Sequence, residues 1–419
     1  MCMKKSFLIL LLFGFVKVGA QTSTFSIADS LFEKGRYKLA LQELDKNKPS
    51  FLSNYKKAVI YESIDNYKKT AEFLEKAIVF KEDEKVKLKL AKTYQRLKIT
   101  NKAVKIYEEI LAKDSLNLVL KYQLGKLYLN SKDADKAVRI FKYLIDNDAL
   151  NANYSYQLAL AFALKNDRDR MINSFIATYK KDTLHLKAIE NLASSFKKLN
   201  DIDSTQLFVE KGLAIDKNHI NLNRLKINQL FRDEKYKEII PFLLNLDSID
   251  KKDTYSMSML GRTYYNLDSL EKAKAYFKKI SRVDREDFKA RTYLGHVALK
   301  EKDYKAATLN YMMATYIGKE KRDEEFYGLA TVYYEKQEPQ LAIKFFEKAY
   351  AENSGNYKAL FQLAKLSDDY YKDKKMAYKL YNKYIRAFYD ADEDMANFVK
   401  SRIKDVKQEY FMKGESLED

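Results

Sequence analysis

The chain has 419 residues, a formal net charge of +18, 46% hydrophobic residues and 14% aromatic residues. This composition excludes an intrinsically disordered chain, because disordered segments contain few aromatic and large apolar residues. With only 11 Gly and 3 Pro, few positions suit special turn conformations or break helices, which indicates an all-α protein.

The N-terminal residues 1–20 have the three parts of an export signal. Two Lys form a positive segment, residues 7–16 are apolar, and residues 18–20 form a small-residue cleavage site. The apolar run is short for a membrane span, so we predict a signal peptide cleaved after Ala20, with an uncleaved anchor as the alternative. The single Cys, Cys2, precedes the apolar run. Lipid anchoring is therefore disfavoured, and the mature chain has no thiol for a disulfide, a metal site or a nucleophile.

A pattern of five residues recurs along the rest of the chain. It consists of Leu, a small residue, an aromatic three residues later, Ala nine residues later and an aromatic four residues after that. In one copy these are Leu124, Gly125, Tyr128, Ala137 and Phe141. The small position recurs at steps of 33 to 35 residues, at Ala58, Ala91, Gly125, Ala159, Ala193, Ile227, Gly261, Gly295, Ala330 and Ala364. A fixed period of this length predicts a solenoid, with Ala28 and Ala40 in a shorter first copy.

Gly125 lies in the middle of an expected helix, where Gly costs about 1 kcal/mol relative to Ala. Leu124, Gly125 and Tyr128 share one helical face. We expect this face to pack closely on Ala137 and Phe141 of a second helix, so that tighter packing offsets the lost helix propensity. A large side chain at Gly125 should then overpack the crossing by about 1–3 kcal/mol.

The motif resembles that of the tetratricopeptide repeat family over most of the mature chain. The resemblance implies an all-α solenoid over residues 21–390, in which about eleven helix-turn-helix repeats stack into a right-handed superhelix. The family's Pro at the end of the second helix is absent from every copy, and the chain has no Trp. The copy at about 220–250 is degenerate and has Pro241 in its second helix. A proline is tolerated in the first turn of a helix, but it kinks the helix if it lies deeper. The eleventh copy places Ala377 one residue late.

The C-terminal segment predicts one further helix, beginning near Asp392 or Asp394. Its apolar stripe consists of Val399, Ile403, Val406 and Tyr410. Because the ends of a repeat array need a polar outer face, we expect residues 391–413 to form a capping helix. Residues 414–419 are predicted to be a flexible tail.

No catalytic constellation is present in the sequence. His185, His219 and His296 are far apart and have no partners at metal-ligand spacing. The sequence has neither a Gly-rich phosphate loop nor an H-E-x-x-H motif. We therefore predict a non-enzymatic protein with no cofactor and no bound metal.

The resemblance to tetratricopeptide repeats implies that the first helices line a concave groove where partner peptides bind. We project this groove onto positions three and two before, one after, and four or five after each small residue. The candidates are Lys92, Tyr122, Gln123, Lys126, Tyr156, Gln157, Asn191, Arg224, Asn228, Arg262, Tyr265, His296 and Tyr334. Tyr and Arg are enriched in binding hot spots, but with 33 Tyr in the chain a groove of other use and a plain scaffold surface stay open as alternatives.

The predicted function is an exported interaction scaffold that binds a protein or peptide partner in a periplasmic or outer-membrane-linked assembly. The Lys- and Asn-rich exported sequence resembles those of Bacteroidota bacteria. As an alternative, residues 81–200 hold 24 basic and 14 acidic side chains, which predicts binding of an anionic envelope polymer or glycan with a steep salt dependence. The same excess of basic residues is also explained by Lys residues scattered over a solvated surface, without any ligand. Nucleic acid is disfavoured, because export separates the protein from it.

Overall fold

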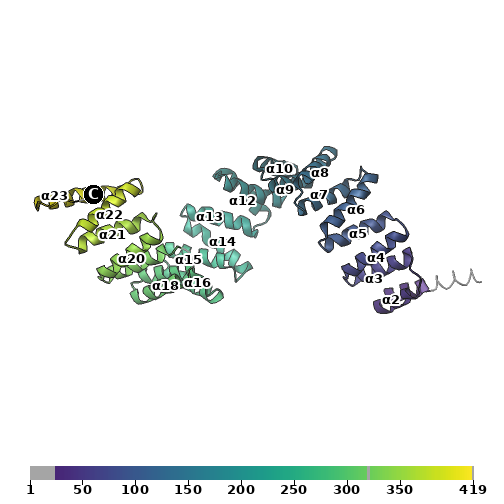
Figure 1. The fold of residues 1–419 in the computed structure, drawn as a ribbon, viewed down its shortest axis with the longest axis horizontal. Coiled ribbons are helices and arrows are strands. Elements are labelled where there is room, and N and C mark those ends of the chain that lie inside the picture. The colour runs from purple at the N-terminus through teal and green to yellow at the C-terminus, as the bar shows by residue number, and fades with distance from the viewer. Residues whose placement is uncertain (1–23, 319–320, 418–419) are drawn as a thin grey trace, which may run out of the picture. The chain divides into compact units, whose positions relative to one another are not determined.

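The computed structural model describes residues 24–318 and 321–417. Across these residues all regular structure is helical and no strand is present, as Figure 1 shows. The prediction of an all-α solenoid of paired helices is thereby confirmed. The expected signal peptide at 1–20 lies outside the described residues, as do residues 418–419 of the expected tail. The chain divides into two units, residues 1–215 and residues 216–419.

Unit 1, the part up to residue 215, begins with a helical stretch at 24–33. The helices that follow are α2 (Tyr37–Asp45), α3 (Phe51–Ser63), α4 (Tyr67–Phe80), α5 (Glu84–Arg96), α6 (Thr100–Lys113), α7 (Leu118–Asn130), α8 (Ala134–Asn147), α9 (Ala152–Leu164), α10 (Arg168–Lys181), α11 (Leu186–Lys198) and α12 (Ile202–Ile215).

Unit 2, the part from residue 216 on, continues the same alternation of helices. It consists of α13 (Ile220–Arg232), α14 (Tyr236–Ile249), α15 (Thr254–Asn266), α16 (Leu270–Val283), α17 (Phe288–Lys300), α18 (Tyr304–Ile317), α19 (Asp323–Glu335), α20 (Pro339–Glu352), α21 (Tyr357–Tyr370), α22 (Lys375–Phe388) and α23 (Glu393–Met412).

The turn inside each hairpin has the same backbone conformation in nine copies. Seven residues after the small position, one residue adopts a left-handed conformation, such as Lys132 with φ 60° in the copy that contains Gly125. The next amide, that of Asp133, donates to the carbonyl of Tyr128 at 2.8 Å, which closes the end of the first helix. The nine residues are Asp65, Lys98, Lys132, Asn166, Asn200, Glu234, Asp268, Lys302 and Gln337. This turn is therefore built largely without glycine, in keeping with the low Gly content of the chain.

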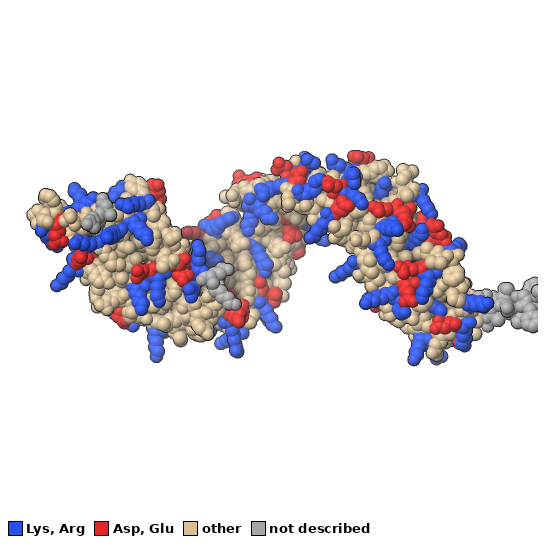
Figure 2. Space-filling model, viewed as in Figure 1, with Lys and Arg blue, Asp and Glu red and all other residues tan. Residues whose placement is uncertain are grey.

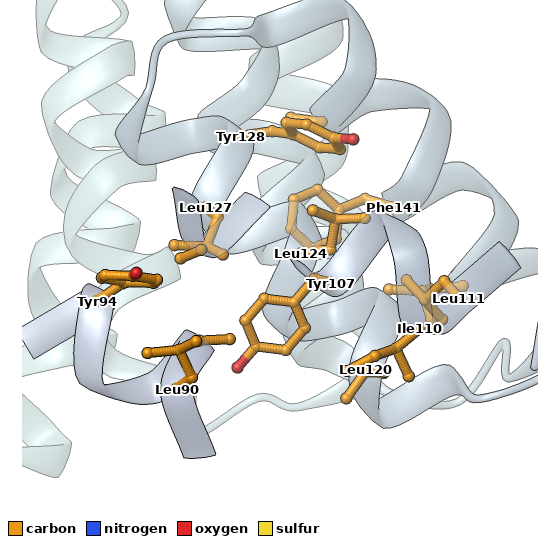
Figure 3. Packing of buried hydrophobic residues seen from close by; sticks show 14 of the residues in the cluster. Leu90, Tyr94, Tyr107, Ile110, Leu111, Leu120, Leu124, Leu127, Tyr128 and Phe141 are labelled. Carbon is orange, nitrogen blue, oxygen red and sulfur yellow. The ribbon is translucent and has the colours of Figure 1, made fainter. Parts of the chain in front are cut away.

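The small positions of the repeat lie in the core, where aromatic rings of the second helices pack on the first helices. A Cβ atom added to Gly125 would lie 2.7 Å from the Phe141 ring, and one added to Gly295 would lie 2.6 Å from the Tyr311 ring. Ala137 is also fully buried. In Figure 3 the rings of Phe141 and Tyr107 lie among the leucine side chains of neighbouring helices. The close crossing expected at Gly125 is confirmed, and the ring is what approaches its backbone.

The two irregular copies keep their helices but change local details. Pro241 is the sixth residue of α14, beyond the first turn, so the carbonyl of Lys237 has no amide to accept from at that position. In the eleventh copy α21 is one residue longer than the usual first helix and α22 begins only at Lys375. This shift explains the late position of Ala377, which is nevertheless buried.

Helix α23 packs on the α21–α22 hairpin. Asp392 caps its N-terminus by accepting from the Met395 amide at 3.0 Å. Arg402 donates from Nε and Nη2 to the two carboxylate oxygens of the buried Asp368, at 2.6 and 3.2 Å. Tyr410 donates its hydroxyl hydrogen to Asp373 at 2.6 Å.

Among the described residues, no helix is long and apolar enough to cross a membrane.

Candidate functional site

Three first helices of unit 2, α15, α17 and α19, are neighbours and together line a cavity of about 760 Å³. We call this cavity the unit 2 cradle. Its lining consists of Ser258, Arg262, Phe288, Lys289, Thr292, Tyr293, Lys321, Asp323, Glu324 and Glu325. The volume falls in the range of natural ligand sites, and the lining combines both signs of charge with aromatic rings.

Arg262 is the half-buried cation of the unit 2 cradle, and its Nη1 donates a weak hydrogen bond to Met259 Sδ at 3.8 Å. Its guanidinium carbon lies 4.6 Å from the centre of the Phe231 ring and 5.8 Å from that of Tyr293. Its Nε is buried and has no hydrogen-bond partner within the described part of the chain. No carboxylate of the described residues forms an ion pair with it. Aromatic faces stabilise the charge and fix its position, and no carboxylate of the described residues neutralises it.

His296 connects the cradle to the core through two hydrogen bonds. Its Nδ1 lies 2.7 Å from the Tyr311 hydroxyl and its Nε2 lies 2.9 Å from the Glu324 carboxylate. Because an ionised carboxylate only accepts, Nε2 carries a hydrogen, and in the neutral ring Nδ1 accepts from Tyr311. The hydrogen bond from His296 lowers the pKa of Glu324, and the charges of Arg262 and Lys289 act in the same direction. Burial raises the pKa of Tyr311.

The acidic side chains of the cradle already have partners. Glu325 is 2% exposed and accepts from the Thr292 hydroxyl at 2.5 Å. Asp323 accepts from the side-chain amides of Asn353 and Asn356 at 3.0 and 2.9 Å. The lining side chains with hydrogen-bond donors left to pair are the cations Arg262, Lys289 and Lys321, so the site is better suited to an anionic group than to a cation.

Tyr293 provides a fixed aromatic surface beside Arg262. Its ring stacks on Phe277 with centres 4.8 Å apart and an interplanar angle of 7°. His296 meets it edge to face at 5.5 Å. Burial raises the pKa of the Tyr293 hydroxyl, so the ring is neutral at physiological pH. Rings held on both sides offer contact area with little side-chain ordering on binding.

Of the predicted groove residues in unit 2, only Arg262 lines the cradle. His296 is not part of the lining but contacts one lining residue, Glu324. Tyr265 packs at the edge, with the Lys300 ammonium 4.3 Å from its ring centre. Tyr334 is more than half exposed at the end of α19, away from the cavity lining.

Arg224 and Asn228 gather around a different residue, Tyr255 of α15. The Arg224 guanidinium lies 4.8 Å from the Tyr255 ring centre and forms an ion pair with Asp253 at 3.1 Å. The Tyr255 hydroxyl donates to Asn228 at 3.2 Å. These two predicted residues therefore hold α13 and α15 together.

The predicted residues of unit 1 show more internal packing. Tyr122 lies 6.2 Å from Phe141 and Tyr156 lies 5.6 Å from Phe175, each ring on the second helix of its own hairpin. Asn191 donates to a backbone carbonyl of its own helix. The other four are half-buried or exposed: Lys92, Gln123, Lys126 and Gln157. The thirteen candidates thus form two sets, one per unit, and a single groove through both stays a prediction.

The prediction did not name several residues of the unit 2 cradle. Ser258 and Thr292 occupy the position three before the small residue, and Tyr293 the position two before, the same offsets that gave Tyr122 and Gln123. Other lining residues, Lys289 and Glu324, lie six before the small residue, one helical turn earlier. Extending the projection by one turn would have found them.

Comparison with known proteins identifies the same repeat that the sequence pattern predicts. Profiles of the tetratricopeptide repeat match residues 86–115, 120–149 and 255–287, so both units contain tetratricopeptide repeats. The chain is similar to yeast Tom70 (14% identity, covering 94% of this chain and 97% of that chain, TM-score 0.43). It is also similar to Cut9 in the APC/C hetero-tetramer Cut9–Hcn1 (12%, 90% and 83%, 0.45) and to YrrB, a repeat protein with an unusual peptide-binding site (16%, 44% and 96%, 0.36). These similarities concern the fold alone. No curated protein matches the chain in sequence.

Proposed function

We propose that the chain is a non-enzymatic interaction scaffold whose unit 2 cradle binds an acidic segment of a protein partner. Tetratricopeptide repeats generally serve as protein-interaction scaffolds, which supports the first part. The second part depends on Arg262, a ring-bound guanidinium at a cavity of about 760 Å³ that forms no ion pair with a carboxylate of the described residues.

Recognition of the partner begins with its carboxylate. A guanidinium presents several N–H donors in one plane and pairs with a carboxylate through two parallel hydrogen bonds. Tyr293 and Phe288 contact the neighbouring side chains of the segment, and the exposed Lys289 and Lys321 raise the rate of encounter with an acidic partner. His296 contacts the exposed Glu324 carboxylate at 2.9 Å, and this negative charge disfavours a second acidic group of the segment beside it, which orients the segment.

A peptide experiment tests this proposal. Immobilised random 12-residue peptides are synthesised in pairs, with Glu in one member and Gln in the other, and probed with the full chain. We expect Glu members to bind better, and Arg262→Gln to weaken that binding at least tenfold and remove the preference. Arg285→Gln, a change of the same charge at an exposed turn, is the matched control. Equal binding of both members, or an unchanged preference in Arg262→Gln, would contradict the proposal.

We also propose that the protein is exported and works in the periplasm, in an assembly linked to the outer membrane. This proposal is supported by the charged, apolar and small-residue segments at 1–20. Cell fractionation with an antibody against unit 2 tests it. A shortened chain in the periplasmic fraction is the expected result, and a full-length chain confined to the cytosol would refute it.

The anionic-polymer alternative concerns residues 81–200. Several Lys residues there form ion pairs within the chain, including Lys87 with Glu82 at 2.6 Å and Lys89 with Glu62 at 2.6 Å. Each internal pair reduces the charge available to a polyanion. Heparin serves as a probe, because binding through counterion release would weaken steeply between low and high salt. Binding that is strong and salt-sensitive would favour the polymer over the peptide.

A further inference from the structure

Helix α18, the second helix of its hairpin, carries an exposed apolar stripe that the proposed function does not use. Successive members are three, one and three residues apart, so they lie on one face of the helix. They are Leu309, Met312, Met313 and Tyr316, exposed by 59%, 50%, 37% and 92%. We call this set the α18 stripe.

The neighbouring copies show that the core does not require apolar residues at these positions. The hairpin's own core contacts are made by other residues of α18, since Ala307, Tyr311 and Ala314 are fully buried. At the four positions matching the α18 stripe, α16 has Ala275, Lys278, Lys279 and Arg282, all exposed. In α20 the matching exposed residues are Lys344, Glu347, Lys348 and Ala351. Within the described residues, α18 is the one second helix with large apolar side chains at all four positions.

Large exposed apolar side chains gathered on one face mark interaction surfaces. The α18 stripe extends over eight residues, Leu309 to Tyr316, which is about 10 Å at a rise of 1.5 Å per residue, and is one helix face wide. Such a narrow row fits the apolar face of a single partner helix. Met312 and Met313 are flexible and adapt to the partner's shape, while Tyr316 is of a type enriched in binding hot spots.

The charges beside the stripe define the partner further. In the flanking hairpins the matching outward residues include five cations, Lys278, Lys279, Arg282, Lys344 and Lys348, against one anion, Glu347. In Figure 2 the surface over α18 is mostly uncharged, with Lys and Arg side chains projecting near it. A second copy of this chain would bring like charges together, which is unfavourable.

We propose that the α18 stripe binds an amphipathic helix that has an apolar row and acidic residues on both sides of that row. The apolar row packs on Leu309, Met312 and Tyr316. The acidic residues face the cations of α16 and α20. These charge pairs contribute more to the choice of partner than to the strength of binding. This surface lies on second helices and is independent of the unit 2 cradle, which lies on first helices.

The decisive variant transfers the outward face of α20 onto α18. In Leu309→Lys/Met312→Glu/Met313→Lys, each new residue is the one that α20 carries at the matching exposed position, so the helix should fold. Two synthetic 18-residue amphipathic helices serve as probes, identical in their Leu row but flanked by Glu in one and by Lys in the other. Fluorescence anisotropy measures their affinity for the full chain, and circular dichroism verifies folding. Leu207→Lys, at an exposed apolar position of α12 that matches Leu309 in the repeat, is the matched control.

We expect the Glu-flanked helix to bind at least tenfold more tightly than the Lys-flanked one, and the triple variant to lose that affinity at least tenfold. Leu207→Lys and Arg262→Gln should leave it unchanged, which separates this surface from the unit 2 cradle. Equal binding by the folded triple variant, or a preference for Lys flanks, would overturn the proposal. It would also be overturned if neither helix bound while the stripe mediated self-association in ultracentrifugation or binding to anionic phosphatidylglycerol vesicles.

Discussion

The first helices of unit 1 and unit 2 share one repeat geometry but present different surfaces. Three residues before the small position, two copies of unit 1 have Tyr122 and Tyr156, whose rings pack on Phe141 and Phe175. At the same position two neighbouring copies of unit 2 have Ser258 and Thr292, which both line the unit 2 cradle. A large side chain at this position fills the face, and a small one leaves room for a cavity. The repeat thus conserves the backbone arrangement while side-chain volume decides where a site can form.

The position after the small residue shows the same contrast for charge. In unit 1 Lys126 is exposed, with its ammonium 5.7 Å from the Tyr122 ring centre. In unit 2 Arg262 is half-buried between the Phe231 and Tyr293 rings. A solvated Lys contributes little to a specific contact, whereas a partly desolvated Arg that lacks an anion gains much from one.

The largest expected effect comes from Tyr311→Ala. Tyr311 is fully buried, its ring lies against the backbone of Gly295 and Gly328, and its hydroxyl contacts His296. Truncation leaves a cavity and should lower the stability of unit 2 by about 3–5 kcal/mol. Urea denaturation followed by hydrogen exchange should show the loss in unit 2 and not in unit 1. The counterpart Phe141→Ala should destabilise unit 1 and leave acidic-peptide binding intact.

Gly295→Ala should have a smaller effect on the same hairpin. The new methyl would lie 2.6 Å from a carbon of the Tyr311 ring, and a fully buried ring has little room to move. Overpacking of about 1–3 kcal/mol should outweigh the gain of about 1 kcal/mol in helix propensity. Thermal unfolding measures the outcome, and a stabilised variant would show that the ring is not a tight contact.

Ser258→Tyr gives the unit 2 cradle the tyrosine that unit 1 has at the matching position, in Tyr122 and Tyr156. Because Ser258 is half-buried and lines the cavity, we expect the ring to occupy the space of the partner segment. Binding of Glu-containing peptides should fall about tenfold, equivalent to roughly 1.4 kcal/mol, while the melting temperature changes little. Unchanged peptide affinity in a folded variant would place the binding site elsewhere.

The smallest effect concerns Glu324 and pH. The hydrogen bond from His296 lowers its pKa in the folded state, so its contribution to stability is present above the ordinary Glu pKa of about 4.3. That contribution is lost as pH falls through the lowered folded-state pKa. The Glu324 side chain is 64% exposed, so we expect at most about 0.5 kcal/mol. The difference in melting temperature between wild type and Glu324→Gln should shrink from pH 7 to pH 3, and Glu335→Gln on the same helix is the control.

Much of the fold follows from the repeat pattern alone. Every small position from Ala58 to Ala364 is in a first helix, and even the atypical Ile227 is fully buried. The candidate site was harder to predict. The same projection from the small positions selected Arg262 and His296 together with Tyr122 and Tyr156, and only the structure distinguishes the residues beside a cavity from those packed on their own hairpin.

The sequence by itself determined which residues face the core, because a period of 33 to 35 residues repeats the same local helix contacts in every copy. Only the tertiary structure decided which surface positions are open, since this depends on side chains from different hairpins. The ion pair between Arg402 and Asp368 and the bond between Thr292 and Glu325 join residues more than 30 positions apart. Such contacts depend on side-chain volume, charge and rotamer rather than on the repeat period.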